Sequence, residues 1–520
     1  MSILRSRCAL RVMLLSAGLL GLAGCGDSGN RVGYKPARSG PDQPLREEAE
    51  KPNTENYNLI VDNPFLSAKE HPQSTFSTSV DTASYSNVRR FLNDRQLPPK
   101  DAVRIADMLN YFDYDYPEPR EDHPVAVDLE MAPCPWNDKH HLLKIAVKAR
   151  TISPSQMPPR NLVFLIDTSG SMDEPNRLPL VKQSLELLIQ QLGERDRVSI
   201  VSYAGEASLR LPPTPGHLSK KIRQAINGLD ASGSTNGGGG IVMAYEKAQQ
   251  SFIPGGVNRV ILATDGDFNV GVSSDAELIR LIEQKRKTGI YLTVLGYGMG
   301  NLKDNKLELL AHHGNGHYAY IDSIDEARKV FVDQGGALAV VAKDVKLQVE
   351  FNHTQVNAYR LIGYENRVMR NEDFRDDDKD AGDMGSGHTC TAMYEIVPIR
   401  VEMPLPNAGT LKYQQTGTDT PATRTGEWLT VRMRYKNPDS EQGRELATVM
   451  PANGLTKQPS EDFRFAASVA GFGMLLRDSD YKGEATFAKV RNWANASLGA
   501  DRKGLRSEFV RLVSIAQGLK

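Results

Sequence analysis

The stretch Asn161–Met172 reads NLVFLIDTSGSM and joins an apolar run directly to a carboxylate and two hydroxyls. Residues 162–166 show no polar alternation, so both faces of this strand should be covered, as in a parallel sheet packed between layers of helices. Asp167 ends the run, and Ser169 and Ser171 follow at alternate positions. Because alternate residues of an extended loop point to the same side, we expect these three side chains to converge at a strand end.

Strand and helix signals alternate from residue 161 to about residue 342. Repeated units of this kind build a doubly wound, mainly parallel α/β sheet of the Rossmann-like type, whose ligand site lies at the carboxyl ends of the strands. Asp167 stands at such an end. The further expected strands are 197–203, 260–263 and 290–296, and the expected helices contain Val181, Leu185, Leu188 and Leu192 or begin at Ser274–Glu277 and Ser323–Glu326.

The two flanks of this region carry a different pattern, in which apolar and polar residues alternate. Such runs predict half-exposed antiparallel strands at 125–131 and 142–147 before the α/β region and at 345–351 and 429–435 after it. We therefore expect a β-sandwich built from both flanks, with the α/β domain inserted between them.

Two further stretches are expected to be helical. One is Tyr85–Phe112, and the other is a C-terminal stripe that includes Phe465 and Phe472. The expected order is a signal peptide (1–24), a flexible tether (25–58), an N-terminal segment of helices and strands (59–158), the α/β domain (159–342), a β-rich domain (343–440) and a C-terminal helical region (441–520).

The N-terminus has the pattern of a secretory signal, with arginines before an apolar run at 12–23 that is too short to cross a bilayer as a mature helix. The run ends in Leu22-Ala23-Gly24-Cys25, which resembles a bacterial lipoprotein signal. That resemblance implies that Cys25 is acylated, for example with palmitate, and that the protein is anchored in the cell envelope. Gly26 favours the outer membrane of a Gram-negative cell over the inner one. A secreted protein with a fortuitous cysteine is the alternative.

Composition excludes some classes of function. The formal net charge is -1 and no long basic run occurs, so we expect no binding of nucleic acid. Of the four cysteines, Cys134 and Cys390 remain once the signal is removed and Cys25 is modified. An oxidising compartment permits them to pair, and the sequence leaves a disulfide between them open.

Two more loops carry oxygen donors. Thr235 lies in GSTNGGGG (233–240), and Asp265 follows a buried strand in LATDGDFN (262–269). Oxygen-only donors with few charges suit a hard cation such as Mg²⁺. The alternative is a serine-rich turn with helix-capping aspartates, and a further one is a degenerate site that no longer binds metal.

Together these loops resemble the von Willebrand factor type A (VWA) domain with its metal-ion-dependent adhesion site. The resemblance implies that Ser169, Ser171 and Thr235 contact the cation directly, while Asp167 and Asp265 contact it directly or through water. The cation expected is Mg²⁺, with Mn²⁺ or Ca²⁺ as alternatives. Residues 63–99, together with DMLNYFDYDYP (107–117) and YRLIGYENR (359–367), are similar to bacterial VWA lipoproteins.

Other motifs are weaker. GDSGN (26–30) lies in the expected tether without partners for serine-protease chemistry, and the glycines at 237–240 lack the lysine of a phosphate-binding loop. DDDKDAGD (376–383) has Ala381 where a calcium loop needs glycine, which favours a solvated acidic loop. The pairs His140-His141 and His312-His313 lack the spacing of a helical zinc site, and we expect structural roles for them.

Three functions are compatible with these observations. We expect a non-enzymatic binding module whose cation accepts an Asp or Glu side chain from a partner protein. The alternative is a structural or assembly scaffold of an envelope complex, in which the metal only stabilises loops. A hydrolase that uses the cation as a Lewis acid ranks last, because the sequence offers no base or nucleophile near the motif.

Overall fold

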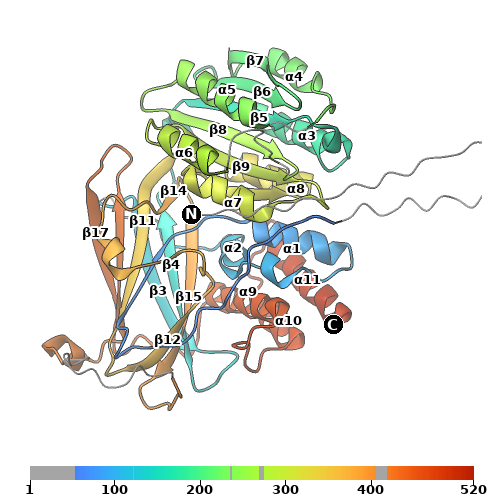
Figure 1. Ribbon diagram of the computed structural model, residues 1–520. Coiled ribbons are helices and arrows are strands. Elements are labelled where there is room, and N and C mark those ends of the chain that lie inside the picture. Colours follow the sequence, from blue (N-terminus) through green and yellow to red (C-terminus); the bar gives the residue numbers. More distant parts are fainter. Residues whose placement is uncertain (1–52, 121, 235–236, 267, 269–274, 406–418) are drawn as a thin grey trace, which may run out of the picture. The chain divides into compact units, whose positions relative to one another are not determined.

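The strand that contains the apolar run lies in the middle of a six-stranded sheet in the computed structural model, which describes residues 53–405 and 419–520 apart from 121, 235–236, 267 and 269–274 (Figure 1). The strand order is β10-β9-β8-β5-β6-β7, and every neighbouring pair is parallel except β6 and β7. The strands are β5 (Arg160–Asp167), β6 (Arg197–Tyr203), β7 (Ala207–Pro215), β8 (Val257–Thr264), β9 (Tyr291–Tyr297) and β10 (Tyr318–Ile321).

Helices cover both faces of this sheet, which confirms the doubly wound α/β fold (Figure 1). Leu162, Phe164 and Ile166 pack into the core beneath one helix layer, and Val163 and Leu165 pack into the core beneath the other. Both faces of β5 are therefore buried, which explains why its sequence shows no alternation of polar and apolar residues. The first layer contains α3 (Leu178–Ile189), α4 (Ser219–Asn227) and α8 (Ile324–Arg328), and the second contains α5 (Gly237–Gln250), α6 (Asp275–Arg286) and α7 (Asp304–His313).

The two flanks together form a β-sandwich, as expected. Its two sheets have the orders β1-β12-β15-β4-β3 and β13-β2-β11-β16-β17, and they share one apolar core. Each sheet combines strands from before and after the α/β domain. The strands are β1 (Leu66–Ser67), β2 (Gln73–Ser77), β3 (Val125–Pro133), β4 (His141–Ala149), β11 (Val340–Phe351), β12 (Val356–Ile362), β13 (Val368–Met369), β14 (Gly382–Gly385, paired with β11), β15 (Thr389–Pro398), β16 (Leu429–Lys436) and β17 (Gly443–Met450).

Strand β11 differs from the half-exposed strand that its alternating sequence predicts. Its polar residues Lys346 and Gln348 are 2% and 6% exposed. They are covered because the segment after β13 packs over this face: Lys346 Nζ donates to the Asp373 carbonyl at 3.2 Å, and Gln348 Nε2 donates to the Asn371 carbonyl at 3.3 Å. Polar side chains can therefore be buried here, because their hydrogen bonds are satisfied.

Two expected helical stretches also differ. The stretch Tyr85–Phe112 forms two helices, α1 (Ala83–Asn93) and α2 (Ile105–Asn110), instead of one. Pro98 and Pro99 lie between them, and proline lacks the N–H that a continuous helix needs. Residues 443–450, assigned to the C-terminal helical region, form the edge strand β17, because the turn at Asn437–Ser440 folds them back against β16.

The remaining helices pack beside α1 and α2 around a separate apolar core. They are α9 (Glu461–Arg477), α10 (Phe487–Asn495) and α11 (Leu505–Leu519), and the expected stripe at Phe465 and Phe472 is buried in α9. Short helical turns are η1 (Lys100–Ala102), η2 (Pro154–Gln156), η3 (Gly170–Asp173), η4 (Lys329–Asp333), η5 (Gly335–Leu338), η6 (Asn371–Phe374) and η7 (Pro421–Thr425).

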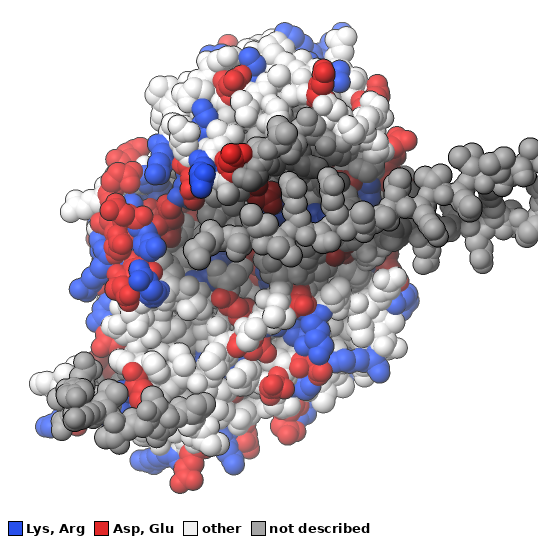
Figure 2. Space-filling model, viewed as in Figure 1, with Lys and Arg blue, Asp and Glu red and all other residues white. Residues whose placement is uncertain are grey.

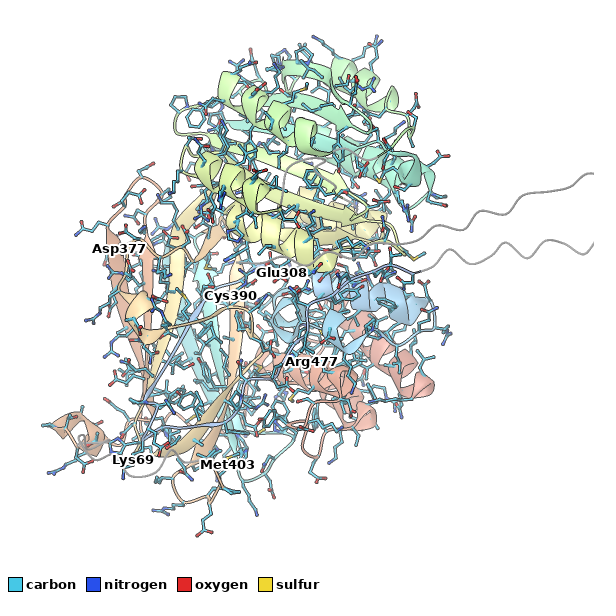
Figure 3. The ribbon with its side chains drawn as sticks, viewed as in Figure 1. Lys69, Glu308, Asp377, Cys390, Met403 and Arg477 are labelled. Atoms are coloured by element: carbon cyan, nitrogen blue, oxygen red, sulfur yellow. The ribbon has the colours of Figure 1, made fainter. Side chains whose placement is uncertain are left out.

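Cys134 and Cys390 are both buried free thiols, so the disulfide left open by the sequence is not formed here. Figure 3 places Cys390 inside the sandwich, where its Sγ lies 3.1 Å from the Tyr364 hydroxyl. Cys25 and the expected signal and tether up to residue 52 lie outside the described residues. Among the helices of the described ranges, none combines the length and apolar character needed to cross a membrane.

Candidate cation site at the carboxyl edge of the central sheet

Three parallel strands end side by side at the site. Asp167 closes β5 and lies in register with Tyr203, the last residue of β6. On the other side of β5, Thr264 closes β8 and Asp265 follows it. Asp167 and Asp265 are 0% and 1% exposed, so the sheet brings two carboxylates to one edge and removes both from solvent.

The loop after β5 holds the two serines next to each other. Ser169 N donates to Asp167 Oδ1 at 2.9 Å, and the hydroxyls of Ser169 and Ser171 lie 3.1 Å apart. The chain turns into the short helical segment η3 after Ser169 instead of staying extended as the sequence suggested. Ser169 is buried and Ser171 is exposed, so the pair of hydroxyls connects the buried carboxylate with the surface.

The second oxygen of Asp167 accepts two hydrogen bonds from neutral side chains. The Tyr203 hydroxyl and Thr264 Oγ1 both donate to Oδ2, each at 3.1 Å. Within the described part of the chain Asp167 forms no ion pair. Burial raises the pKa of this carboxyl to about 6, hydrogen bonds from Ser169 oppose the rise, and the neighbouring Asp265 carboxylate adds to it.

The glycine-rich loop docks against the same motif. Gly170 N donates to the Gly233 carbonyl at 3.0 Å, and Ser232 N donates to the Thr168 carbonyl at 2.8 Å. These bonds hold the beginning of the loop at the strand end. Thr235 itself, the expected third hydroxyl ligand, lies outside the described residues.

Arg177 reaches the site from just before α3. Its Nη1 lies 2.9 Å from Asp265 Oδ2 and donates to the Ser171 carbonyl at 2.5 Å. Nη2 donates to the carbonyl of Met299, in the loop after β9, at 2.7 Å. The two aspartates thus differ, because Asp265 has a guanidinium partner and Asp167 has neutral donors.

The donors fit a hard divalent cation. They are carboxylate and hydroxyl oxygens, and Asp167 is a buried carboxylate without a cationic partner among them. Across the described ranges, no group of three or more His, Cys, Asp or Glu side chains could hold a metal ion. The candidate set is of another kind, since two carboxylates are combined with hydroxyl groups.

Reasoning from the sequence missed three residues at this edge. Tyr203 and Thr264 orient Asp167, and Arg177 contacts Asp265. Thr264 could have been found from its place directly before Asp265 at the end of a buried strand. Tyr203 and Arg177 carry no such signal, because their contacts depend on strand register and on a loop from elsewhere in the chain.

The acidic segment around 376–380 is ion-paired at several positions. Asp377 contacts Arg434 at 2.9 Å, and Asp380 contacts Arg286. Figure 2 shows acidic and basic side chains interspersed on this side of the molecule. Most of the segment is exposed, as the sequence predicts for a solvated acidic loop, and arginines of β16 and α6 partly neutralise its charge.

Each histidine pair makes a polar contact with a glutamate within the fold. His140 Nδ1 lies 2.6 Å from Glu395 Oε1, and His313 Nδ1 lies 2.9 Å from Glu283 Oε1. Burial lowers the pKa of His312 to about 3, and the nearby Arg367 guanidinium adds to this effect, so His312 stays neutral.

Comparison with known families divides the chain into three parts. A model of the von Willebrand factor type A domain matches residues 161–333, and one described as von Willebrand factor matches residues 51–144. A model of the C-terminal part of the uncharacterized protein YfbK matches residues 336–519. The resemblance to VWA proteins is confirmed for the central domain and extends to this C-terminal part.

Individual relatives match different shares of the chain. The uncharacterized protein YfbK of Escherichia coli (strain K12) is 41% identical over 477 residues, which cover 90% of this chain and 82% of that protein. The human inter-alpha-trypsin inhibitor heavy chain H4 is 28% identical over 188 residues, 35% of this chain and 19% of that one. The solved structure of a von Willebrand factor type A protein from Catenulispora acidiphila is 15% identical, covers 73% of this chain and 88% of its own, and has a TM-score of 0.40.

Proposed function

Because this chain belongs to the YfbK family and contains a VWA domain, a type of domain that commonly mediates protein–protein interaction, we propose that it is a metal-dependent binding module of the cell envelope. The module is anchored by lipid on Cys25, in the outer membrane of a Gram-negative cell. Its VWA domain holds a divalent cation, Mg²⁺ in the first place and Mn²⁺ or Ca²⁺ as alternatives. Its partner is a protein that presents an Asp or Glu side chain.

The observation that carries this proposal is the environment of Asp167. Its carboxylate is 0% exposed and accepts hydrogen bonds from Ser169, Tyr203 and Thr264, none of which is charged. A buried carboxylate is unfavourable unless a positive charge compensates it. A divalent cation bound directly by Ser169, Ser171 and Thr235, and by Asp167 and Asp265 directly or through water, would supply that charge.

The accessible side of the site suits a protein partner. Ser171 and Met299 are exposed, and Met299 is a large apolar side chain with 42% of its surface accessible. A bound cation would supply an open coordination position for an oxygen ligand. A partner's carboxylate could take that position while neighbouring side chains rest on Met299, so that cation and partner bind more tightly together than alone.

We propose a binding role and no catalytic one. In the described part of the structure, no histidine or lysine side chain contacts Asp167 or Ser169. A hydrolytic mechanism needs a base or nucleophile within hydrogen-bond reach of the reacting group.

A scaffold function is the second candidate, and buried ion pairs between the VWA domain and the flanking helices favour it. Arg89 of α1 contacts Glu326 of α8 at 2.8 Å, and Arg104 contacts Asp304 of α7. Such pairs join the domain to the rest of the chain. Under this alternative, partners bind the sandwich or the C-terminal helices, and the cation only stabilises the loops.

Titration calorimetry distinguishes the candidates. Mg²⁺ and Mn²⁺ are titrated into the soluble chain that begins after Cys25, beside the variant Asp167→Ala. The proposal expects one-site binding by the wild type, its loss in the variant, and Mg²⁺-dependent capture of an envelope protein by the wild type alone. Capture by Asp167→Ala at the wild-type level would favour the scaffold.

The membrane anchor needs its own test. Cells that express the wild type or Cys25→Ala are labelled with a fatty-acid analogue and then fractionated. We expect label in the outer membrane for the wild type and none for the variant. Equal membrane recovery of both proteins would contradict the anchor.

A further inference from the structure

Arg177 occupies a place where a divalent cation and a guanidinium would compete. Its Nη1 lies 2.9 Å from Asp265 Oδ2, and Asp265 is one of the carboxylates assigned to the cation. The same Nη1 also donates to the carbonyl of Ser171, the exposed hydroxyl residue of the motif. One positive side chain therefore binds two residues of the proposed cation site.

The loop after β9 contacts the Arg177 side chain and fixes its position. Nη2 of Arg177 donates to the Met299 carbonyl at 2.7 Å. Gly298, with φ of +76°, lies under the side chain: an added Cβ would overlap Nε and lie 2.7 Å from Cγ of Arg177. The close approach requires glycine, so the position of this loop determines where the guanidinium lies.

The end of the expected flexible tether (25–58) holds the same loop, so residues 54–56 are bound to the fold and not flexible as the sequence suggested. Thr54 N donates to the Gly300 carbonyl at 2.8 Å, and Asn56 N donates to the Leu302 carbonyl at 3.0 Å. The segment therefore runs alongside the loop through backbone hydrogen bonds, and Asn56 forms a parallel bridge with Lys303.

Glu55 fixes the segment from a second direction. Its Oε1 accepts from Gly300 N at 2.8 Å, and its two oxygens accept from the guanidinium of Arg90 on α1 at 2.9 and 3.0 Å. The Glu55 and Arg90 side chains are 2% and 9% exposed. A continuous set of contacts thus leads from α1 and the N-terminal segment, through residues 298–302, to Arg177 and Asp265.

We propose that Arg177 is an internal counter-cation that competes with the divalent ion for Asp265, and that the segment Thr54–Asn56 sets its position. This inference rests on the proposed function. A displacement of the segment releases the loop that carries Met299. The guanidinium then leaves Asp265 more readily, and the affinity for the cation rises.

The direction of the effect follows from charge. Two cations near one carboxylate repel each other, and the repulsion is strong at a site shielded from water. The Arg177 side chain is 12% exposed and that of Asp265 is 0% exposed. Removal of the guanidinium takes away the positive charge that competes with the cation beside Asp265, whereas removal of a remote arginine does not.

Calorimetric titration of Mn²⁺ into the soluble chain tests the first part with Arg177→Gln. We expect affinity to rise about tenfold, because one unit of positive charge is removed beside the site. Arg177→Lys keeps the charge and should stay within about threefold of the wild type. Arg223→Gln, which removes an arginine from an exposed pair in the same domain, should leave the affinity unchanged.

Thr54→Pro tests the second part, because it removes the N–H that donates to Gly300. We expect affinity for Mn²⁺ to rise about twofold to fivefold, the range set by one hydrogen bond. Thr54→Ser keeps both the N–H and a hydroxyl that can donate to the Gly300 carbonyl and to Asn301 Oδ1, so it is the matched control. Equal affinity of Thr54→Pro and Thr54→Ser would overturn the role of the segment.

The outcomes separate this inference from the proposed function. One outcome is that Asp167→Ala abolishes Mn²⁺ binding while Arg177→Gln binds Mn²⁺ no more tightly than the wild type. In that case Arg177 does not compete with the cation, and the proposed cation site is still supported. If the wild type binds nothing and Arg177→Gln does bind, competition is supported in its strongest form. If neither binds Mn²⁺, both the inference and the cation site fail.

Discussion

Buried carboxylates occur in two settings in this chain, and the settings differ in what compensates the charge. Where the VWA domain meets the flanking helices, arginine side chains compensate the charge of the carboxylates. Arg104 contacts Asp107 at 2.9 Å and also contacts Asp304, and all three residues are at most 8% exposed. At the carboxyl edge of the central sheet, Asp167 is 0% exposed and has three neutral donors.

This difference distinguishes buried aspartates that stabilise the fold from a buried aspartate that is available to a ligand. A carboxylate paired within the chain stabilises the fold only while its partner is present, and neither residue can accept a further ligand without a loss. Among the described residues Asp167 has no such partner, so we expect that the fold does not depend on its charge. Removal of one charged group should therefore destabilise the fold at the junction but not at Asp167.

The largest effect is expected at the junction. Arg104→Ala leaves Asp107 and Asp304 buried without their guanidinium partner, which should lower the free energy of unfolding by about 3–5 kcal/mol. Chemical denaturation of the soluble chain followed by circular dichroism measures it. Lys100→Ala is the matched control, because Lys100 and its partner Asp478 are 63% and 47% exposed. A loss below about 1 kcal/mol for Arg104→Ala, within the range of an exposed pair, would contradict the comparison.

Asp167→Asn should behave in the opposite way. In the presence of a chelator we expect no loss of thermal stability, because the amide keeps the shape of the carboxyl group and removes an uncompensated charge. Mg²⁺ at a hundred times its dissociation constant should stabilise the wild type by about 2.7 kcal/mol and the variant not at all. Differential scanning calorimetry with and without Mg²⁺ checks both statements. A large loss of stability in the chelated variant would show that Asp167 is structural.

Glu308 lies between the two cases. It is on α7 near Arg104 and Arg367, at 3.9 and 3.7 Å, and Figure 3 labels it beside the junction. Burial raises the pKa of this carboxyl from 4.5 to about 7, although the two guanidinium groups lower it. The folded chain therefore binds this proton more tightly than the unfolded chain does.

Stability should consequently fall as the pH rises from about 4.5 to 7, since the group ionises at a lower pH in the unfolded chain. Glu308→Gln should remove this slope and make the chain about 3 kcal/mol more stable than the wild type at pH 8. Denaturation midpoints of both proteins at pH 5, 6, 7 and 8 test the prediction. Parallel curves would show that the two arginines already compensate Glu308.

Much of the central domain could be predicted from sequence, because its signals are local. The apolar run that ends at Asp167 predicts a strand buried on both faces, and the spacing of Ser169 and Ser171 predicts adjacent hydroxyls. Both expectations agree with the fold, although the loop turns into a short helix after Ser169. Local patterns suffice here, because the strand and the loop are consecutive in the chain.

The remaining parts depended on contacts between distant segments. Arg177 meets Asp265 and Met299 only after three loops have been brought to one edge. Lys346 reads as a solvent-facing residue of an alternating strand, yet the segment after β13 covers it. The edge strand β17 lacks a strong alternating pattern, and its pairing with β16 fixes its place in the sheet. No local pattern encodes these arrangements.

The smallest effect is expected for the exposed pair of Arg223 and Glu186, at 2.8 Å, whose side chains are 43% and 34% exposed. Solvent screens this pair, so Arg223→Ala should change the free energy of unfolding by less than about 0.5 kcal/mol. Denaturation in low and high salt should give the same small value within error. The pair has nearly the same geometry as the buried pairs at the junction, so it isolates burial as the variable. A loss comparable to that of Arg104→Ala would mean that geometry, not burial, determines how strongly an ion pair stabilises this fold, and the contrast with Asp167 would then lose its basis.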